Sequence, residues 1–127
     1  MIYGIGIDLA QISRIRSAYE RFEQRFADRI LGAYELEEFP KSRNPVRFLA
    51  MRFAAKEATS KAFGTGFKQG VAPRQIEVMH NKAGKPSLIF SGRVAELASE
   101  NRIVASHVSL TDEDDFAVAY VVLERAN

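Results

Sequence analysis

The chain has 127 residues, of which 46% are hydrophobic and 27% charged, and it contains no cysteine. This length favours a single domain over residues 1–127, and the composition excludes a disordered or low-complexity chain. The lack of cysteine excludes a disulfide framework, a thiolate metal site and a cysteine nucleophile, and it favours the reducing cytoplasm. No segment approaches the ~18 apolar residues of a membrane span, so no membrane partner is expected.

Charge is distributed unevenly along the chain. Residues 1–74 hold 13 Lys and Arg against 8 Asp and Glu, whereas residues 75–127 hold 5 against 8. The first part is therefore +5 and the second −3, although the whole chain is only +2. This asymmetry indicates an anionic partner for the first part. Charge alone leaves open a nucleic acid, a phosphorylated cofactor and an acidic protein.

The first half of the chain predicts one strand followed by helices. The strand alternates with a period of two and carries Gly4, Gly6 and Asp8 on one face. Ser13 is placed to cap the first helix, and the last helix is rich in alanine. The expected ranges are 2–9 for the strand and 13–31, 34–39 and 46–63 for the helices, with glycines at 64, 66 and 70 after the last one.

The second half of the chain is dominated by strands. Two short strands flank the turn NKAGK, and Ser91 is placed to cap a helix that ends near Glu100. The expected strands are 76–79, 87–90, 104–110 and 116–123. Helices thus come early and strands late, which predicts an α+β fold with a largely antiparallel sheet packed against a long helix.

Two carboxylates and a lysine form the first candidate site. Glu57 and Lys61 are four residues apart on the central helix and therefore share a face, where small or apolar residues flank Glu57. Considered separately, Glu57 and Lys61 are interpreted as a surface ion pair that stabilises the helix by about 0.3–0.5 kcal/mol. Asp8 on its own is interpreted as a helix cap. Considered together, the three residues offer the oxygen ligands and counter-charge that Mg²⁺ on a phosphate substrate requires.

The loop GTGFKQG after the central helix is a weak phosphate-binding candidate. It could present backbone N–H groups and Lys68 to a phosphate, and Lys56 and Lys61 lie nearby. It lacks the GK[ST] ending of a P-loop, however, and it follows a helix rather than a strand. The other interpretation is a flexible helix stop.

Arginines line one side of the first predicted helix. At about 100° per residue, Arg14, Arg21, Arg25 and Arg29 fall within roughly an 80° sector, beside Phe22. A face of one sign next to an aromatic side chain favours an anionic surface, such as an acidic helical protein. Nucleic acid is disfavoured by the small net charge, the absence of a recognisable reading motif and the acidic second half.

These segments together resemble the bacterial holo-[acyl-carrier-protein] synthases, a family of phosphopantetheinyl transferases. The resemblance covers essentially the whole chain, and the strand Asp with the pattern KEA..KA.G.G is its most specific part. One departure is Gln11, where many relatives have Glu. The matching segments, in the order and spacing of the family, are GIGIDL at 4–9, RFLAMRFAAKEATSKAFGTG at 47–66, GKP at 84–86 and HVSLTDEDDFAVA at 107–119.

The resemblance implies a reaction and its catalytic residues. The enzyme would transfer 4′-phosphopantetheine from coenzyme A to a serine of apo-acyl carrier protein, a step of fatty acid biosynthesis, and release 3′,5′-ADP with Mg²⁺ required. Asp8 and Glu57 would ligate the Mg²⁺, and Lys61 would contact the phosphates. A metal-associated water or a carboxylate would take the serine proton.

The resemblance also implies binding residues and a homotrimer with active sites between protomers. Arg52 and His107 would face the 3′-phosphate of coenzyme A, although His107 alone reads equally well as an ordinary half-buried histidine. The residues implied near the adenosine and phosphates are Gly64, Gly66 and Pro86, and those implied in carrier-protein docking are Arg14, Arg21, Phe22 and Arg25. The alternative function is a noncatalytic adaptor that binds an acidic protein or RNA through the arginine-rich helix.

Overall fold

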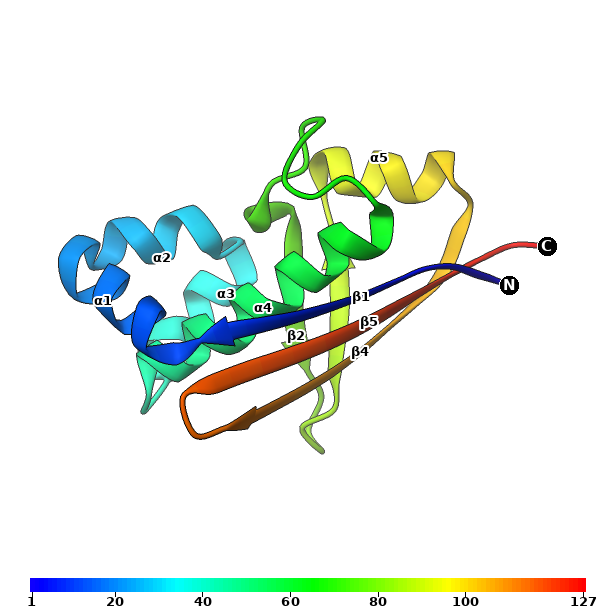
Figure 1. Cartoon of the computed structure of the whole chain (residues 1–127). Coiled ribbons are helices and arrows are strands. Elements are labelled where there is room, and N and C mark those ends of the chain that lie inside the picture. The colour runs from blue at the N-terminus through cyan, green and yellow to red at the C-terminus, as the bar shows by residue number, and fades with distance from the viewer.

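The computed structural model describes residues 1–127 and consists of two antiparallel sheets and five α-helices (Figure 1). The larger sheet has the strand order β1-β5-β4 and the smaller is the β2–β3 hairpin, which confirms the predicted α+β class. The strands are β1 (Ile2–Gln11), β2 (Ile76–His80), β3 (Pro86–Phe90), β4 (Ile103–Glu113) and β5 (Phe116–Arg125). The helices are α1 (Ile12–Phe22), α2 (Gln24–Ile30), α3 (Ala33–Glu38), α4 (Pro45–Phe63) and α5 (Gly92–Glu100), and short 3₁₀ turns occupy Phe39–Lys41 and Pro73–Gln75.

Helix α4, with 19 residues, is the expected long helix and lies along the inner face of the larger sheet (Figure 1). It begins at Pro45, where the Asn44 side chain caps it by accepting a hydrogen bond from the backbone N–H of Arg47 at 3.1 Å. It ends at Gly64, whose φ of 81° is left-handed. No helix, α4 included, is long and apolar enough to cross a bilayer.

Two glycines of β1 set the distance between the larger sheet and α4. A Cβ atom at Gly4 would lie 2.0 Å from the carbonyl oxygen of Ala62, and one at Gly6 would lie 1.9 Å from that of Ala58. Neither position therefore accommodates a side chain. Because side chains alternate along a strand, Asp8 emerges on the same face as these glycines, next to α4.

The outer face of the larger sheet is apolar and exposed. Ile5, Ile7 and Leu9 of β1 are 56%, 59% and 60% exposed, and Tyr120 of β5 is 42% exposed. The strand register places Ile7 beside Tyr120, with Ser109 of β4 next in the row. Thus β1 turns its glycine face toward the core and its large apolar side chains outward.

The first predicted helix is interrupted, so an unbroken helix over 13–31 is wrong. At Glu23 the backbone has φ 51° and ψ −127°, which ends α1, and α2 starts at the next residue. The Glu23 N–H still donates to the Tyr19 carbonyl at 2.7 Å, so the chain changes direction without a linker. The apolar spacing persists across this break, which is why periodicity predicts one helix.

Neither serine predicted as a helix cap makes a capping hydrogen bond. Helix α1 starts after Gln11, and Ser13 instead donates to the Asp115 carboxylate through its backbone N–H at 3.0 Å and its hydroxyl at 2.7 Å. Ser91 occupies the N-cap of α5, but its side chain makes no capping bond. The Ser13–Asp115 contacts fasten the β4–β5 turn to the start of α1.

Candidate active site

Asp8 and Lys61, two of the three residues of the predicted carboxylate site, meet where β1 crosses α4. Lys61 Nζ donates to Asp8 Oδ1 and to the Ile7 carbonyl oxygen, both at 3.1 Å. The Asp8 side chain is 14% exposed and that of Lys61 is 52% exposed. Asp8 does not cap α1, which has no side-chain cap. Its partner is therefore a half-exposed lysine at the edge of solvent rather than the end of a helix.

Glu57 is the third residue, half-buried on α4 one turn before Lys61. Burial raises the pKa of Glu57, and the negative charge of Asp8 raises it further, while Lys61 lowers it. The two carboxylates therefore share one electrostatic environment and repel each other. A cation bound between them would relieve both the repulsion and the desolvation.

The donor atoms at this point fit a hard divalent cation. Two carboxylates supply only oxygen ligands, and Mg²⁺ in proteins is commonly held by one or two carboxylates together with water and substrate phosphates. The structure contains no group of three or more His, Cys, Asp or Glu side chains able to hold a metal ion by themselves. A cation at Asp8 and Glu57 would depend on a phosphate substrate for further coordination.

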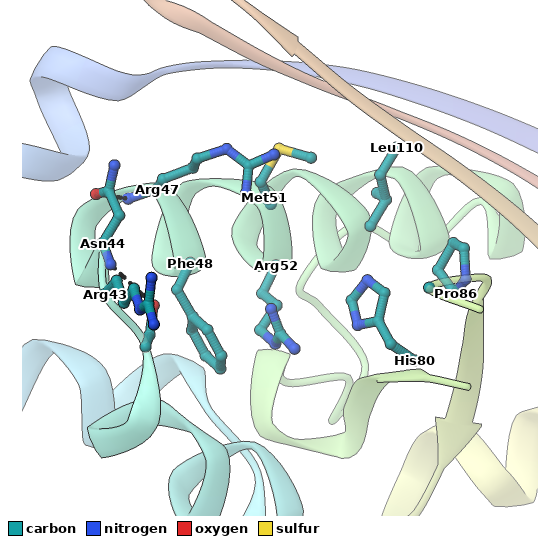
Figure 2. Close-up of a pocket in the computed structure, with 11 residues that line it drawn as sticks. Arg43, Asn44, Arg47, Phe48, Met51, Arg52, His80, Pro86 and Leu110 are labelled. Atoms are coloured by element: carbon teal, nitrogen blue, oxygen red, sulfur yellow. Dashed lines mark hydrogen bonds between the residues drawn. The ribbon is translucent and has the colours of Figure 1, made fainter. Parts of the chain in front are cut away.

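A cavity of about 440 Å³ lies between the first half of α4, the β2–β3 hairpin and β4 (Figure 2). It contains Arg52 and Pro86, both expected from the sequence to contact coenzyme A. The Arg52 guanidinium lies 3.5 Å from the centre of the Phe48 ring, and Figure 2 shows Arg52 between Phe48 and His80. The other lining residues are Ser42, Arg43, Asn44, Arg47, Met51, Gly84 and Leu110.

Arg52 is deeply buried and incompletely paired. It is 9% exposed, and its Nε lies 3.5 Å from Glu35 Oε2 without a hydrogen-bond partner. Burial lowers the pKa of its guanidinium, although the negative charges of Glu35 and Glu38 oppose this effect. Because its charge is only loosely matched by Glu35 and the residue lines the cavity, Arg52 is placed to bind an anionic ligand there.

The cavity and the two carboxylates lie on different sides of α4. Arg52 and Glu57 are five residues apart, which corresponds to about 140° around the helix axis. Asp8 reaches α4 from β1, whereas the cavity is closed by Pro86 of β3 and Leu110 of β4. One chain therefore presents two separate groups of candidate residues rather than one continuous site.

Lys56, which the sequence places beside the glycine loop, is fully buried instead. Its ammonium donates to Glu35 Oε1 at 2.6 Å, to the Pro73 carbonyl oxygen at 3.1 Å and to the Ile76 carbonyl oxygen. Glu35 is 1% exposed and also accepts the backbone N–H of Val78 at 2.9 Å. Lys56 thus joins α3, α4 and β2 and gives the loop no charge.

The glycine loop offers open backbone rather than free N–H groups. A Cβ atom at Gly64 or Gly66 would meet nothing within 4 Å, so a ligand could approach either residue closely. The N–H groups of Thr65 and Gly66 both donate to the Ser60 carbonyl oxygen at 3.2 Å, and so they complete the end of α4. Lys68 is exposed in this loop.

His107 lies away from the cavity, on the outer face of the larger sheet. Its side chain is 60% exposed, so it is not the half-buried histidine of the alternative interpretation. Its Nε2 lies 2.9 Å from Glu124 Oε2. In the strand register it faces Val122, and Ile5 lies beyond. Within one chain, His107 and Arg52 belong to different surfaces.

The arginine face is divided between α1 and α2, so the single helical sector predicted for four arginines is wrong. Arg14, Arg21 and Arg25 are all exposed, and the Arg21 guanidinium lies 5.1 Å from the centre of the Phe22 ring, which is 43% exposed. The turn at Glu23 nevertheless keeps cations beside this aromatic residue. A notch of about 220 Å³ between the two helices is lined by Ala18, Phe22, Arg25, Phe26 and Arg29.

Among the lining residues that were not predicted from the sequence, three have titratable side chains, namely Arg43, Arg47 and His80. Arg47 donates to both carboxylate oxygens of Asp112, at 2.9 and 2.8 Å, and so links α4 to β4. The only charge signal for Arg43 and Arg47 was the basic excess of residues 1–74, and His80 lies outside that part of the chain. A charge excess does not show which residues line a cavity, because this cavity joins segments that are far apart in the sequence.

The chain matches the model of the 4′-phosphopantetheinyl transferase superfamily over residues 4–121. It is also 51% identical over 125 residues to the holo-[acyl-carrier-protein] synthase of Vibrio cholerae, and this match covers 98% of the chain and 99% of that protein. The similarity therefore extends over both groups of candidate residues.

Two solved structures show the same fold. The holo-[acyl-carrier-protein] synthase of Neisseria meningitidis is similar with a TM-score of 0.93 and 43% identity, covering 98% of this chain and 100% of that one. The synthase of Bacillus anthracis, solved in complex with CoA (3′,5′-ADP), is similar with a TM-score of 0.83 and 38% identity, covering 99% of each chain. The resemblance identified from the motifs is thereby confirmed.

Proposed function

The chain belongs to the holo-[acyl-carrier-protein] synthases of the 4′-phosphopantetheinyl transferase superfamily, and we propose how its residues perform the transfer. It is an enzyme that moves 4′-phosphopantetheine from coenzyme A to apo-acyl carrier protein. The assignment of its active site rests on one observation: Lys61 donates a hydrogen bond to Asp8 beside Glu57. No observation favours the alternative of a noncatalytic adaptor.

Asp8 and Glu57 are the residues that hold Mg²⁺ in this proposal. When bound, Mg²⁺ supplies positive charge that stabilises the diphosphate of coenzyme A as it is split. The carboxylate repulsion that raises the pKa of Glu57 supports this assignment, because a shared cation removes it. Lys61, long and half-exposed, turns from Asp8 to the phosphates when the substrate arrives.

The reaction is a phosphoryl transfer to a serine hydroxyl. The serine oxygen bonds to the β-phosphorus of coenzyme A, the bond from that phosphorus to the bridging oxygen breaks, and 3′,5′-ADP leaves with the bridging oxygen. The serine proton passes to a carboxylate of the site or to water. Lys61 offsets the negative charge that grows on the leaving group.

The cavity around Arg52 is the proposed site for the 3′-phosphate and adenosine of coenzyme A. The presence of both Arg52 and Arg43 in the same lining favours an anion there. Pro86 and Phe48 supply apolar surface for the adenine. Gly64 and Gly66 leave room for the phosphates beyond Lys61, at the other end of α4.

The surface of α1 and α2 is the proposed docking site for the acyl carrier protein. Arg14, Arg21 and Arg25 are exposed cations of one sign, and Phe22 offers an apolar anchor between them. An acidic helical partner would match both the charge and the notch that Phe22 lines. This site lies at the end of β1 that carries Asp8, as the reaction requires.

The proposed assembly is a homotrimer with active sites between protomers. The exposed apolar face of β1 and β5 is a surface that a monomer would leave in water. In addition, Arg52 and Glu57 face different sides of α4, and His107 faces a third direction. A neighbouring chain would let coenzyme A span residues of two protomers. Location in the cytoplasm, and a single domain spanning residues 1–127, remain predictions.

The function is tested by weighing the carrier protein. The chain is incubated with coenzyme A, Mg²⁺ and apo-acyl carrier protein, and the carrier is examined by intact-protein mass spectrometry while 3′,5′-ADP is quantified by chromatography. We expect a mass gain of one phosphopantetheine and an equal amount of 3′,5′-ADP. An unchanged carrier mass with every divalent cation tried would refute the proposal.

A further inference from the structure

The cavity beside the first half of α4 contains a histidine that the proposed transfer does not use. His80 is the last residue of β2, where it pairs with Pro86 across the hairpin. Figure 2 shows its ring directed toward Arg52, on the side of the cavity closed by Leu110 and Pro86. The position of His80 is therefore determined by where the β2–β3 hairpin ends, and no sequence motif indicates it.

The charges that surround His80 come from three segments. Arg47 and Arg52 of α4 and Arg43 of the preceding loop line the same cavity, which β4 closes with the uncharged Leu110. A smaller cavity on the other side of His80 contains Glu35 and Glu38 of α3. Glu35 is already engaged by Lys56, and Asp112 by Arg47.

This environment favours the neutral form of the His80 ring in the free protein, although His80 is exposed at the cavity wall. Burial lowers the pKa of His80, and the positive charges of Arg52 and Arg47 lower it further. Of the opposing carboxylates of α3, Glu35 pairs with Lys56 and Arg52, and Glu38 lies 3.6 Å from the ammonium of Lys41. A cationic cavity with a neutral histidine at its wall can gain one more positive charge when an anion enters.

We propose that His80 is a phosphate-binding residue of this cavity and that it takes up a proton when a phosphate monoester binds there. The inference rests on the proposed function, which assigns the 3′-phosphate of coenzyme A to Arg52. The proton comes from solvent, no covalent bond changes, and the imidazolium then donates a hydrogen bond to the phosphate.

The expected pH dependence follows from linkage. A phosphate monoester carries between about −1.5 and −2 charges at neutral pH, which offsets the arginines and raises the pKa of His80 in the complex. Affinity therefore increases as the pH falls from above the pKa of the complex to below that of the free protein. The gain is about tenfold for each unit by which the two pKa values differ.

The phosphate itself titrates near pH 6, so its own protonation must be separated from that of His80. The experiment measures binding of 3′,5′-ADP by isothermal titration calorimetry between about pH 5.5 and 8, in buffers with different heats of ionisation. The wild type is compared with His80→Gln, which is neutral at every pH, and with His80→Lys, which is charged throughout. The protonation of free 3′,5′-ADP is common to all three proteins and cancels in their affinity ratios, whereas protonation in the complex depends on residue 80.

We expect the affinity ratio of wild type to His80→Gln to increase about tenfold toward pH 5.5, with additional proton uptake in the wild type alone. His80→Lys should bind tightly over the whole range. Equal pH dependence and equal proton uptake in wild type and His80→Gln would overturn the inference while leaving the cavity assignment intact. If the wild type transfers phosphopantetheine but does not bind 3′,5′-ADP at any pH, both this inference and the cavity assignment are wrong.

Discussion

At the scale of single residues, the buried pair of Lys56 and Glu35 is the most consequential feature outside the active site. Both side chains are fully buried, and the ammonium satisfies two backbone carbonyl groups as well as the carboxylate. Burial lowers the pKa of Lys56 even though Glu35 opposes the shift. The pair is costly to desolvate, and its net contribution to stability depends on every one of these contacts being present.

Removal of this lysine should therefore destabilise the protein strongly. Lys56→Met keeps the length of the side chain but leaves Glu35 as a buried charge, so the free energy of unfolding should fall by about 3–5 kcal/mol. Urea denaturation followed by circular dichroism measures this change. Lys82→Met, at an exposed position of the β2–β3 turn, is the control and should alter stability by less than about 0.5 kcal/mol. A loss below about 1 kcal/mol for Lys56→Met would contradict the argument.

Single residues also show where the amino-acid sequence is sufficient and where it is not. The sequence alone associates Asp8 with Lys61, because a strand face with two glycines must lie against a helix, and α4 has the matching small residues. The burial of Lys56 was missed, because an i,i+5 offset from Lys61 puts it on another helix face whose neighbours come from α3 and β2. His80 was missed for the same reason, since its neighbours are brought together only by the fold.

At the scale of elements, the contact between β1 and α4 positions the proposed catalytic residues. Gly6→Ala would place a Cβ 1.9 Å from the Ala58 carbonyl oxygen, so strand and helix would have to separate. We expect a loss of at least about 3 kcal/mol in the free energy of unfolding, together with reduced transfer activity. Thermal and urea unfolding measure the loss of stability.

Gly84→Ala is the matched control for this substitution. Its Cβ would meet open space, and only the left-handed φ of 87° opposes it, which costs about 1–2 kcal/mol. Equal losses for the two variants would show that close packing of β1 on α4 is not what requires Gly6.

The pair of helices α1 and α2 carries the proposed docking surface, so a substitution there is expected to change the interaction with the acyl carrier protein. Arg14→Ala should raise the KM for apo-acyl carrier protein about three- to tenfold, and more weakly at high salt, because an exposed cation acts through long-range attraction. The KM for coenzyme A should stay unchanged. Steady-state kinetics at two ionic strengths provides both values.

Arg16→Ala removes an exposed arginine of the same helix that lies outside the proposed face. It should leave the KM for the carrier protein within about twofold of the wild type. The docking assignment fails if Arg16→Ala raises the KM for the carrier protein more than Arg14→Ala does. It also fails if Arg14→Ala raises the KM for coenzyme A to the same extent. Because the helix breaks at Glu23, the spacing of the arginines predicted one helical face where the structure has two helices. The sign of their charge was sufficient to indicate an anionic partner.

At the scale of the whole molecule, the α+β class and the β2–β3 and β4–β5 hairpins followed from local patterns, whereas the pairing of β1 with β5 and the division into two sheets did not. Early helices and late alternating strands leave few ways to bury one core. The exposure of the other face of β1 did not follow, because a row of large apolar side chains ordinarily predicts burial in the core. The glycine face is the covered one, and the face with Ile5, Ile7 and Leu9 is exposed in the single chain.

The assembly can be tested through that exposed face. Ile7→Lys puts a charge in the middle of it, and we expect the molar mass in solution to fall from that of a trimer toward that of one chain, since a buried charge opposes association. Size-exclusion chromatography with light scattering measures the mass. Ile89→Lys, at an exposed position of β3, should leave it unchanged. A wild-type mass of one chain would contradict the trimer.

The most direct test of the account is whether Asp8 and Glu57 jointly hold a divalent cation. Mn²⁺ binding in the presence of coenzyme A is followed by electron paramagnetic resonance for the wild type, Asp8→Asn, Glu57→Gln and the control Glu37→Gln, an exposed residue of α3. We predict one Mn²⁺ per active site in the wild type and control, and at least about a tenfold weaker affinity in each of the other two variants, with transfer activity lost in parallel. Undiminished Mn²⁺ binding and transfer by folded Glu57→Gln would contradict the account.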